Sequence, residues 1–223
     1  MKRKIIKIDK NKCNGCGACA AACHEGAIEM RDGVAYLARE DYCDGLGDCL
    51  PACPTGAISF DMREAPAYNE GAVCAAKGMG GCPGTSPKAF SRKAESVPAR
   101  PIQSRLLQWP CQLKLVPTNA PYLEGASLLI AADCTAYAYG SFHSYFMQGL
   151  VTLIGCPKLD EGDYAEKLGA IISQNGIKSV KIVRMEVPCC GGLELAVKRA
   201  VKASGKTMPL EVVTISTDGR IIE

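Results

Sequence analysis

Four cysteines near the start of the chain have the spacing of a metal-binding loop. They follow the pattern Cys-x2-Cys-x2-Cys-x3-Cys and are Cys13, Cys16, Cys19 and Cys23. Two-residue spacings allow three thiolates to turn around one corner of an iron–sulfur cubane. Gly15 and Gly17 give the loop between them the backbone freedom to wrap that corner. The pattern therefore indicates an iron–sulfur centre.

The same pattern returns thirty residues later with one change. The offset aligns Cys13 with Cys43, Gly15 with Gly45, Gly17 with Gly47, Cys19 with Cys49 and Cys23 with Cys53. Leu46 stands where the second repeat would have its second cysteine, and leucine cannot bind iron.

The incomplete second repeat leaves three alternatives. They are a [3Fe–4S] centre with three thiolates, a [4Fe–4S] centre whose fourth iron takes a non-cysteine ligand, and an empty site. The retained glycines and flanking cysteines favour a filled site. Asp44 and Asp48 are nearby oxygen donors, although loop carboxylates are usually solvated.

A repeat this short predicts a pseudo-symmetric pair of units that pack on each other within residues 1–61, with short strands near 5–8 and 34–37. Residues 62–105 lack sustained periodicity and are rich in glycine and proline, which predicts a linker. This linker carries Cys74 and Cys82.

Residues 106–223 alternate strand and helix patterns, which predicts an α/β domain with a mostly parallel sheet. The expected strands are 113–116, 127–132, 151–154, 180–187 and 210–215, and the expected helices are 160–174 and 193–203.

Four further cysteines each follow one of these expected strands. They are Cys134, Cys156, Cys189 and Cys190. The carboxyl ends of neighbouring parallel strands converge on one crevice, so we expect these thiols to form a third, soft-metal site. Cys82 is a further candidate ligand for it. A catalytic dithiol at Cys189-Cys190, and inert packing of small apolar side chains, are the alternatives.

Residues 1–61 resemble the bacterial two-cluster ferredoxins, on both cysteine runs and on Pro54 after Cys53. The resemblance implies a small ferredoxin-like α+β fold in which the fourth cysteine of each run binds the other cluster. Carried over by position, a [4Fe–4S] cluster one takes Cys13, Cys16, Cys19 and Cys53. Cluster two, [3Fe–4S] or [4Fe–4S], takes Cys43, Cys49 and Cys23. The whole chain also resembles longer ferredoxin-type proteins of anaerobes that add a cysteine-bearing α/β domain.

The composition indicates the cellular compartment and the kinds of partner to expect. Of 223 residues, 14 are cysteine, and Asp9 and Lys10 follow the basic start before any export-type apolar run. We therefore expect a reducing cytoplasm, where thiols bind metal, and no membrane span, which needs about 18 or more apolar residues. The formal charge of +3 counts every cysteine as neutral. Two clusters at about −2 each would bring the charge to roughly −1, and no basic stripe predicts nucleic-acid binding.

Together these patterns predict an iron–sulfur electron-transfer protein rather than an enzyme. Electrons would pass through the ferredoxin clusters to a redox partner protein or to a cysteine-ligated centre in the C-terminal domain. A reductase acting on a small oxidant or disulfide at the C-terminal cysteines is one alternative, and a redox or metal sensor is another.

Overall fold

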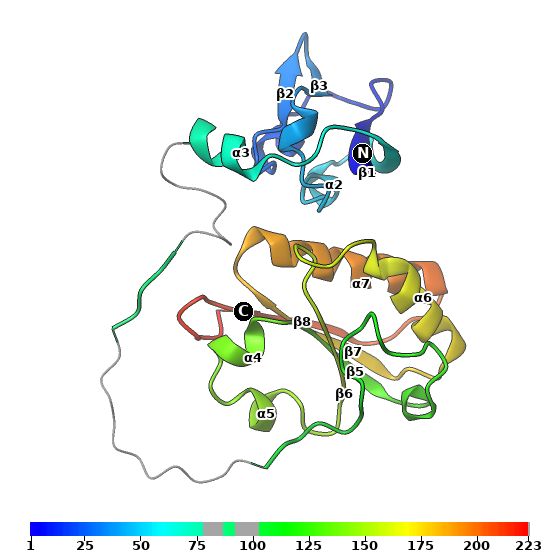
Figure 1. The fold of residues 1–223 in the computed structure, drawn as a ribbon. Helices are drawn as coiled ribbons and strands as arrows, with labels where there is room; N and C mark the ends of the chain where they lie inside the picture. The colour runs from blue at the N-terminus through cyan, green and yellow to red at the C-terminus, as the bar shows by residue number, and fades with distance from the viewer. Residues whose placement is uncertain (78–86, 92–102, 223) are drawn as a thin grey trace. The chain divides into compact units, whose positions relative to one another are not determined.

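The structure is a computed structural model that describes residues 1–77, 87–91 and 103–222. The chain forms two compact units, Met1–Pro87 and Lys88–Glu223 (Figure 1). The boundary falls inside the segment 62–105 that the sequence predicts to be a linker. Cys82 lies outside the described residues, so its predicted role stays a prediction.

The N-terminal unit consists of two antiparallel strand pairs and short helices. Strand β1 (Lys2–Ile8) pairs with β4 (Ile58–Glu64), and β2 (Ile28–Arg31) pairs with β3 (Val34–Leu37). The strands expected near 5–8 and 34–37 are thus present. The helices are α1 (Ala18–Ala21), η1 (Glu40–Tyr42), α2 (Cys49–Ala52) and α3 (Glu70–Ala76).

Helix α3 lies in the segment predicted to be a linker without regular structure, and that part of the prediction is wrong. The Asn69 side chain caps the helix by accepting a hydrogen bond of 2.9 Å from the Ala72 backbone. Val73 is buried, and the Tyr42 hydroxyl donates to the Ala72 carbonyl at 3.0 Å. A helix of seven residues is too short for its periodicity to stand out in the sequence.

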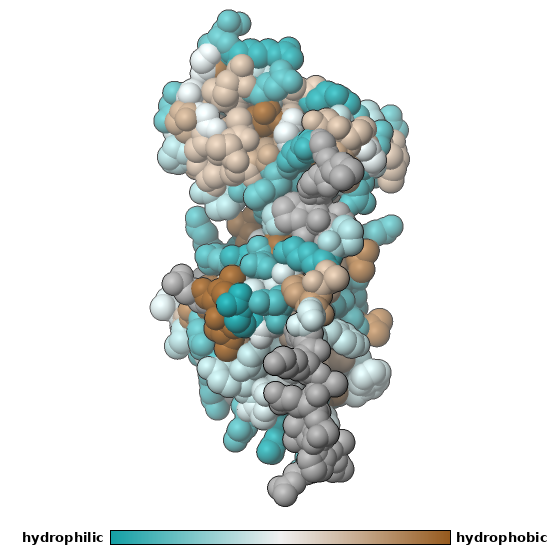
Figure 2. All heavy atoms as spheres, turned by 90° about the vertical axis from the view of Figure 1, so that its left-hand side faces the viewer, coloured by the Kyte–Doolittle hydropathy of each residue, from teal (hydrophilic) through white to brown (hydrophobic). Residues whose placement is uncertain are grey.

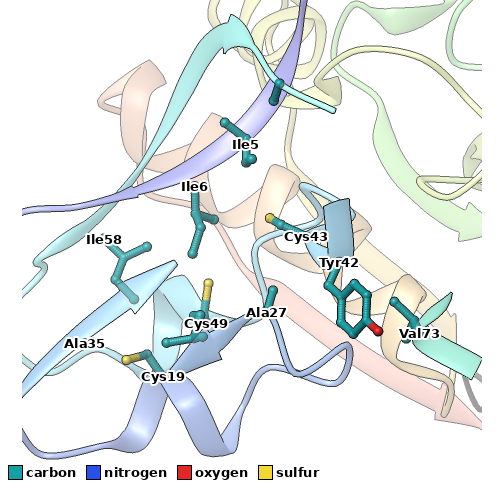
Figure 3. Packing of buried hydrophobic residues seen from close by; sticks show 12 residues of the cluster. Ile5, Ile6, Cys19, Ala27, Ala35, Tyr42, Cys43, Cys49, Ile58 and Val73 are labelled. Atoms are coloured by element: carbon teal, nitrogen blue, oxygen red, sulfur yellow. The ribbon is translucent and has the colours of Figure 1, made fainter. Parts of the chain in front are cut away.

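The core of the N-terminal unit is small and includes thiols (Figure 3). Cys19, Cys43 and Cys49 are buried beside Ile5 and Ile6. Of the twelve largest fully buried side chains in the described chain, Ile5 belongs to this unit and the other eleven to the C-terminal unit. The cysteine side chains therefore occupy space that aliphatic side chains fill in an ordinary core.

The C-terminal unit is built on a four-stranded parallel sheet in the order β6-β5-β7-β8. Its strands are β5 (Ser127–Ala132), β6 (Val151–Gly155), β7 (Ser179–Met185) and β8 (Leu210–Ile215). Helices α4 (Thr135–Ala138) and α5 (Phe142–Tyr145) lie on one face, and α6 (Tyr164–Gln174) and α7 (Gly191–Ser204) lie on the other (Figure 1). The short helices η2 (Pro121–Leu123) and η3 (Pro188–Cys190) complete the unit.

This arrangement confirms the predicted parallel α/β sheet, although the bounds of several elements differ. Helix α6 begins at Tyr164 rather than near 160, because the Asp163 side chain accepts from the Ala165 backbone at 2.9 Å and caps it there. The strand expected at 113–116 is wrong. After one bridge from Gln112 to Ile154 the chain turns, since the Leu115 and Val116 backbone N–H groups both donate to the Gln112 carbonyl.

Figure 2 shows one face of the chain, which is mostly hydrophilic with apolar side chains in small groups. Single exposed apolar side chains are ordinary on protein surfaces. Among the described residues, we find no helix with the length and apolarity that a membrane crossing requires.

Candidate iron–sulfur sites

Glycines shape both cysteine loops of the N-terminal unit. Gly15 has φ +75°, and a Cβ atom there would lie 2.4 Å from the Gly33 carbonyl oxygen. Gly45, thirty residues later, has φ +78°, and its Cβ would lie 2.5 Å from the Lys4 carbonyl oxygen. Because each loop packs directly against another backbone segment, these two positions require glycine. The two repeats therefore share one loop conformation.

The first thiol set combines residues of both repeats. Burial raises the pKa of Cys19, and the nearby thiols of Cys53 and Cys13 raise it further. Cys53 belongs to the second repeat, so the fold brings it to the loop of the first. Cys16 lies exposed on the same loop. These are the four residues that the ferredoxin resemblance assigns to cluster one.

The second thiol set mirrors the first with one member fewer. Burial raises the pKa of Cys49, and the thiols of Cys23 and Cys43 add to that shift. All three cysteines line one pocket. Figure 3 shows the Cys49 sulfur directed toward Ile6 and the Cys19 sulfur directed away from it, as expected if they serve different sites.

Backbone N–H groups stabilise thiolates in both sets. Ala27 N–H donates to the Cys23 sulfur at 3.2 Å, and Ala57 N–H, thirty residues later, donates to the Cys53 sulfur at 3.3 Å. The Thr55 hydroxyl also contacts the Cys53 sulfur and contributes most to lowering the pKa of Cys53. Thiolates with N–H donors are what an iron–sulfur cluster needs from a protein, so the donor set fits such clusters.

Leu46 occupies a loop that keeps the shape of its four-cysteine counterpart. The Leu46 N–H donates to Asp44 Oδ1 at 3.0 Å, and the Cys16 N–H donates to Asn14 Oδ1 at 3.3 Å in the equivalent turn. The second loop therefore keeps the turn of the first, although leucine stands at the position of a cysteine.

The pocket of the second set also contains carboxylates, one of which the sequence did not reveal. Asp44 and Asp48 line it as predicted neighbours, and Glu25 lines it as well. Glu25 is 9% exposed, and its burial, reinforced by the charge of Asp44, raises its pKa to about 7. The repeat alignment, which sets Glu25 against Thr55, is the signal that could have drawn attention to it.

The third candidate site lies at the carboxyl ends of three adjacent strands. Cys134 follows β5, Cys156 follows β6, and Cys189-Cys190 follow β7. Burial raises the pKa of Cys134, and Cys156, Asp133 and Cys189 contribute in the same direction. Cys190 interacts with Cys134 and Cys156 as well. The structure thus brings together the four thiols that the sequence places here. Three of them, Cys134, Cys189 and Cys190, follow β5 or β7, the two strands between which the strand order of the parallel sheet switches from one side to the other.

Cys189 and Cys190 form a coupled pair at the start of α7. The Cys189 thiol donates a hydrogen bond to Cys190, which lowers the pKa of Cys190. Helix α7 begins at Gly191 and spans 14 residues, so its N-terminal end also favours a negative charge at this position. The hydrogen bond and the helix end therefore both favour a thiolate at Cys190.

Acidic and phenolic groups surround the third site. The Asp133 carboxyl is partly buried, which raises its pKa, and its Oδ1 has no hydrogen-bond partner among the described residues. The Tyr164 hydroxyl donates to the Asp160 carboxylate, and the Cys156 N–H donates to that carboxylate at 3.4 Å. The sequence analysis did not single out Tyr164 or Asp160, because neither lies in a recognisable motif.

The remaining cysteines and histidines have simpler environments. Cys74 lies on α3, and Cys111 is half-buried ahead of β5. His143 Nδ1 accepts from the Arg105 backbone at 3.2 Å. Within the described ranges, no group of three His, Cys, Asp or Glu side chains is arranged to hold a metal ion. A cluster separates its ligands by iron and sulfide atoms, so its thiols lie farther apart than the ligands of one ion.

Comparison with known proteins agrees with these two parts of the chain. Residues 12–57 match the family model described as a 4Fe-4S dicluster domain, and residues 120–223 match a Rossmann-like domain. The chain thus joins a ferredoxin-type iron–sulfur segment, with the electron-transfer role that this implies, to a Rossmann-like domain.

One relative aligns with about half of the chain. A curated protein of Archaeoglobus fulgidus, whose name is "uncharacterized protein", is 34% identical over 115 residues. The aligned part makes up 51% of this chain and 81% of the archaeal protein. The chain therefore belongs to the same family as that protein.

Proposed function

We propose that the chain is an iron–sulfur electron carrier whose N-terminal unit holds two clusters of unequal ligand number. It passes electrons to a partner protein or to a cysteine-bound centre in the C-terminal unit. The observation that carries this proposal is the exchange of cysteines between the repeats. Cys53 joins the thiols of the first loop, and Cys23 joins those of the second.

Proximity of the two thiol sets supports transfer between the clusters. The Cys19 thiol of the first set contributes to the raised pKa of Cys49 in the second, so the two sets are neighbours. Iron and sulfide supply the one-electron chemistry when they are bound. The chain supplies the ligands, the N–H donors to sulfur and the burial that together set the reduction potential.

Unequal ligand sets give the carrier a direction. The first site offers four thiolates and the second three, beside a pocket with three carboxylates. Cluster type, net charge and hydrogen bonding determine the potential, so two such different sites will differ in potential. Electrons then settle on one cluster and leave from it.

The C-terminal thiols are proposed to hold a third iron–sulfur or metal centre. Cys134, Cys156, Cys189 and Cys190 converge from three strands, and the lowered pKa of Cys190 favours the thiolate form that binds metal. Cys82 stays a candidate for a further ligand.

Both the two N-terminal clusters and the third centre can be tested by measuring iron and acid-labile sulfide in the full chain under anaerobic conditions. Cys13→Ser should lower the iron content and remove one N-terminal cluster signal in EPR, whereas the matched control Cys111→Ser should change neither. Replacing Cys189 and Cys190 by serine in the otherwise unchanged chain should also lower the iron content, but it should leave the EPR signals of the N-terminal clusters unaltered. An unchanged iron content in the Cys13→Ser protein would contradict the carrier proposal. An unchanged content in the double variant would contradict the third centre.

A reductase at the C-terminal thiols is a second candidate, favoured by the Cys189–Cys190 hydrogen bond and the nearby Tyr164–Asp160 pair. Reduction of a small disulfide takes two electrons and two protons and yields two thiols, with the electrons delivered by the clusters. Dithionite-reduced protein should then be oxidised by an added disulfide, and Cys190→Ser should abolish this oxidation. A rate of oxidation that is equal in the two proteins would exclude this function.

A further inference from the structure

Glu25 is a buried carboxylate that the carrier proposal leaves without a role. It is 9% exposed and lines the same pocket as Cys23, Cys43 and Cys49. These three thiols form the set that lacks a fourth cysteine because Leu46 replaces it. A carboxyl oxygen donor therefore lies in the pocket of the thiol set whose motif lacks one cysteine.

Burial of this carboxylate is unfavourable without a cation nearby. Its strongest charged neighbour is Asp44, which is also acidic, and Asp48 adds to the repulsion. The Lys77 charge acts on Glu25 more weakly than burial and Asp44 do. Taking an ionised carboxylate out of water is unfavourable unless a partner compensates, and an iron ion in the pocket would be such a partner.

The other two carboxylates of the pocket already have partners. Asp44 Oδ1 accepts the Leu46 N–H at 3.0 Å, and Asp48 Oδ2 lies 3.9 Å from His24 Nε2. The hydrogen bond that acts on the Glu25 carboxylate comes from its own backbone N–H. Of the three, Glu25 has the greatest capacity left for a metal ion.

The complete site provides an internal comparison. Thr55 stands in the second repeat where Glu25 stands in the first, and each follows by two residues the cysteine that crosses to the other loop. Thr55 is exposed, and its hydroxyl contacts the Cys53 sulfur at 3.5 Å. The buried acid thus occurs beside the three-thiol set, and a neutral, exposed residue occurs beside the four-cysteine set.

We propose that the Glu25 carboxylate is the oxygen ligand of the fourth iron in the second cluster, which is then a [4Fe–4S] centre with three thiolates and one carboxylate. This inference rests on the proposed N-terminal clusters. Carboxylate is a harder ligand than thiolate, so the fourth iron is held less tightly than the other three and exchanges first.

The test compares wild-type protein with Glu25→Gln after anaerobic reconstitution with ferrous iron and sulfide. Glu29→Gln is the matched control, because Glu29 is exposed on β2 in the same repeat. Loss of the carboxylate should weaken retention of the fourth iron at least about tenfold. The EPR signal of an oxidised three-iron cluster should then grow in Glu25→Gln at the same ferrous iron concentration, and Glu29→Gln should match wild type.

A second background separates ligation from a structural role. Leu46→Cys restores the fourth thiolate, so adding Glu25→Gln to it should leave the iron content and the EPR spectrum unchanged. The inference is overturned if Glu25→Gln retains the fourth iron, if it lowers iron equally in both backgrounds, or if wild-type protein keeps a three-iron cluster in excess ferrous iron. Iron-free wild-type protein would instead overturn the carrier proposal itself.

Discussion

The two units of this chain place their thiols by opposite means. In the N-terminal unit the candidate ligands lie in two short loops, and the buried thiols are themselves part of a small core. In the C-terminal unit a parallel sheet with a large aliphatic core carries the thiols at its strand ends. We expect the first arrangement to depend on bound metal for folding, because its core is small. The second should fold without metal. The difference shows that cysteines can be placed as part of a small core or at the strand ends of a large, separate one.

Removal of iron should have the largest effect. It should unfold the N-terminal unit and leave the C-terminal unit folded. Structural metal sites supply about 10–16 kcal/mol of folding free energy in zinc-finger peptides, and the N-terminal core has little to replace such a contribution. Anaerobic chelation should therefore abolish the hydrogen-exchange protection of β1 and β4 while β5 and β7 stay protected. If β1 and β4 stay protected from hydrogen exchange without iron, the N-terminal unit does not depend on metal for folding.

Substitution of Cys23 or Cys53, the last cysteine of each repeat, tests which of the two N-terminal clusters each residue binds. Cys53→Ser should remove the EPR signal of the cluster bound by the first loop, and Cys23→Ser that of the cluster bound by the second. If the repeats instead bound their own fourth cysteines, each substitution would affect the other cluster. The spectra of the two variants decide between these arrangements, with Cys74→Ser as a control on α3.

A substitution that creates a cavity beside β5 should lower the stability of the C-terminal unit alone. Leu129 is fully buried, so Leu129→Ala should lower the free energy of unfolding of this unit by about 2–5 kcal/mol. Urea unfolding followed by circular dichroism measures the change, and the exposed Leu115→Ala serves as a control. Iron bound by the N-terminal cysteines should remain constant, and a parallel loss of that iron would mean that the units do not act separately.

The smallest effect is expected at the cap of α3. Asn69→Ala removes the side-chain acceptor for the Ala72 N–H and should destabilise the helix by about 1 kcal/mol. Asn69→Asp keeps an acceptor and should behave like wild type. Faster hydrogen exchange confined to α3 is the expected observation, and equal rates in both variants would show that the cap contributes nothing measurable.

The same contrast explains what the sequence could predict. The N-terminal thiol sets lie in local spacings, so a motif reveals them, and the strands that deliver Cys134 and Cys156 are buried apolar runs typical of parallel sheets. The strand predicted at 113–116 is absent because the chain turns there, although Leu113 and Val116 are as buried as strand residues. Glu25 escaped detection because its burial depends on the packing of both repeats, which spacing along one chain does not encode.

EPR of the dithionite-reduced full chain under anaerobic conditions tests the central claim most directly. Two reduced clusters in neighbouring thiol sets should interact magnetically and give a broadened spectrum. That spectrum should collapse to the signal of one isolated cluster in Cys53→Ser. A wild-type spectrum from a single isolated cluster, or protein without any iron, would contradict the account.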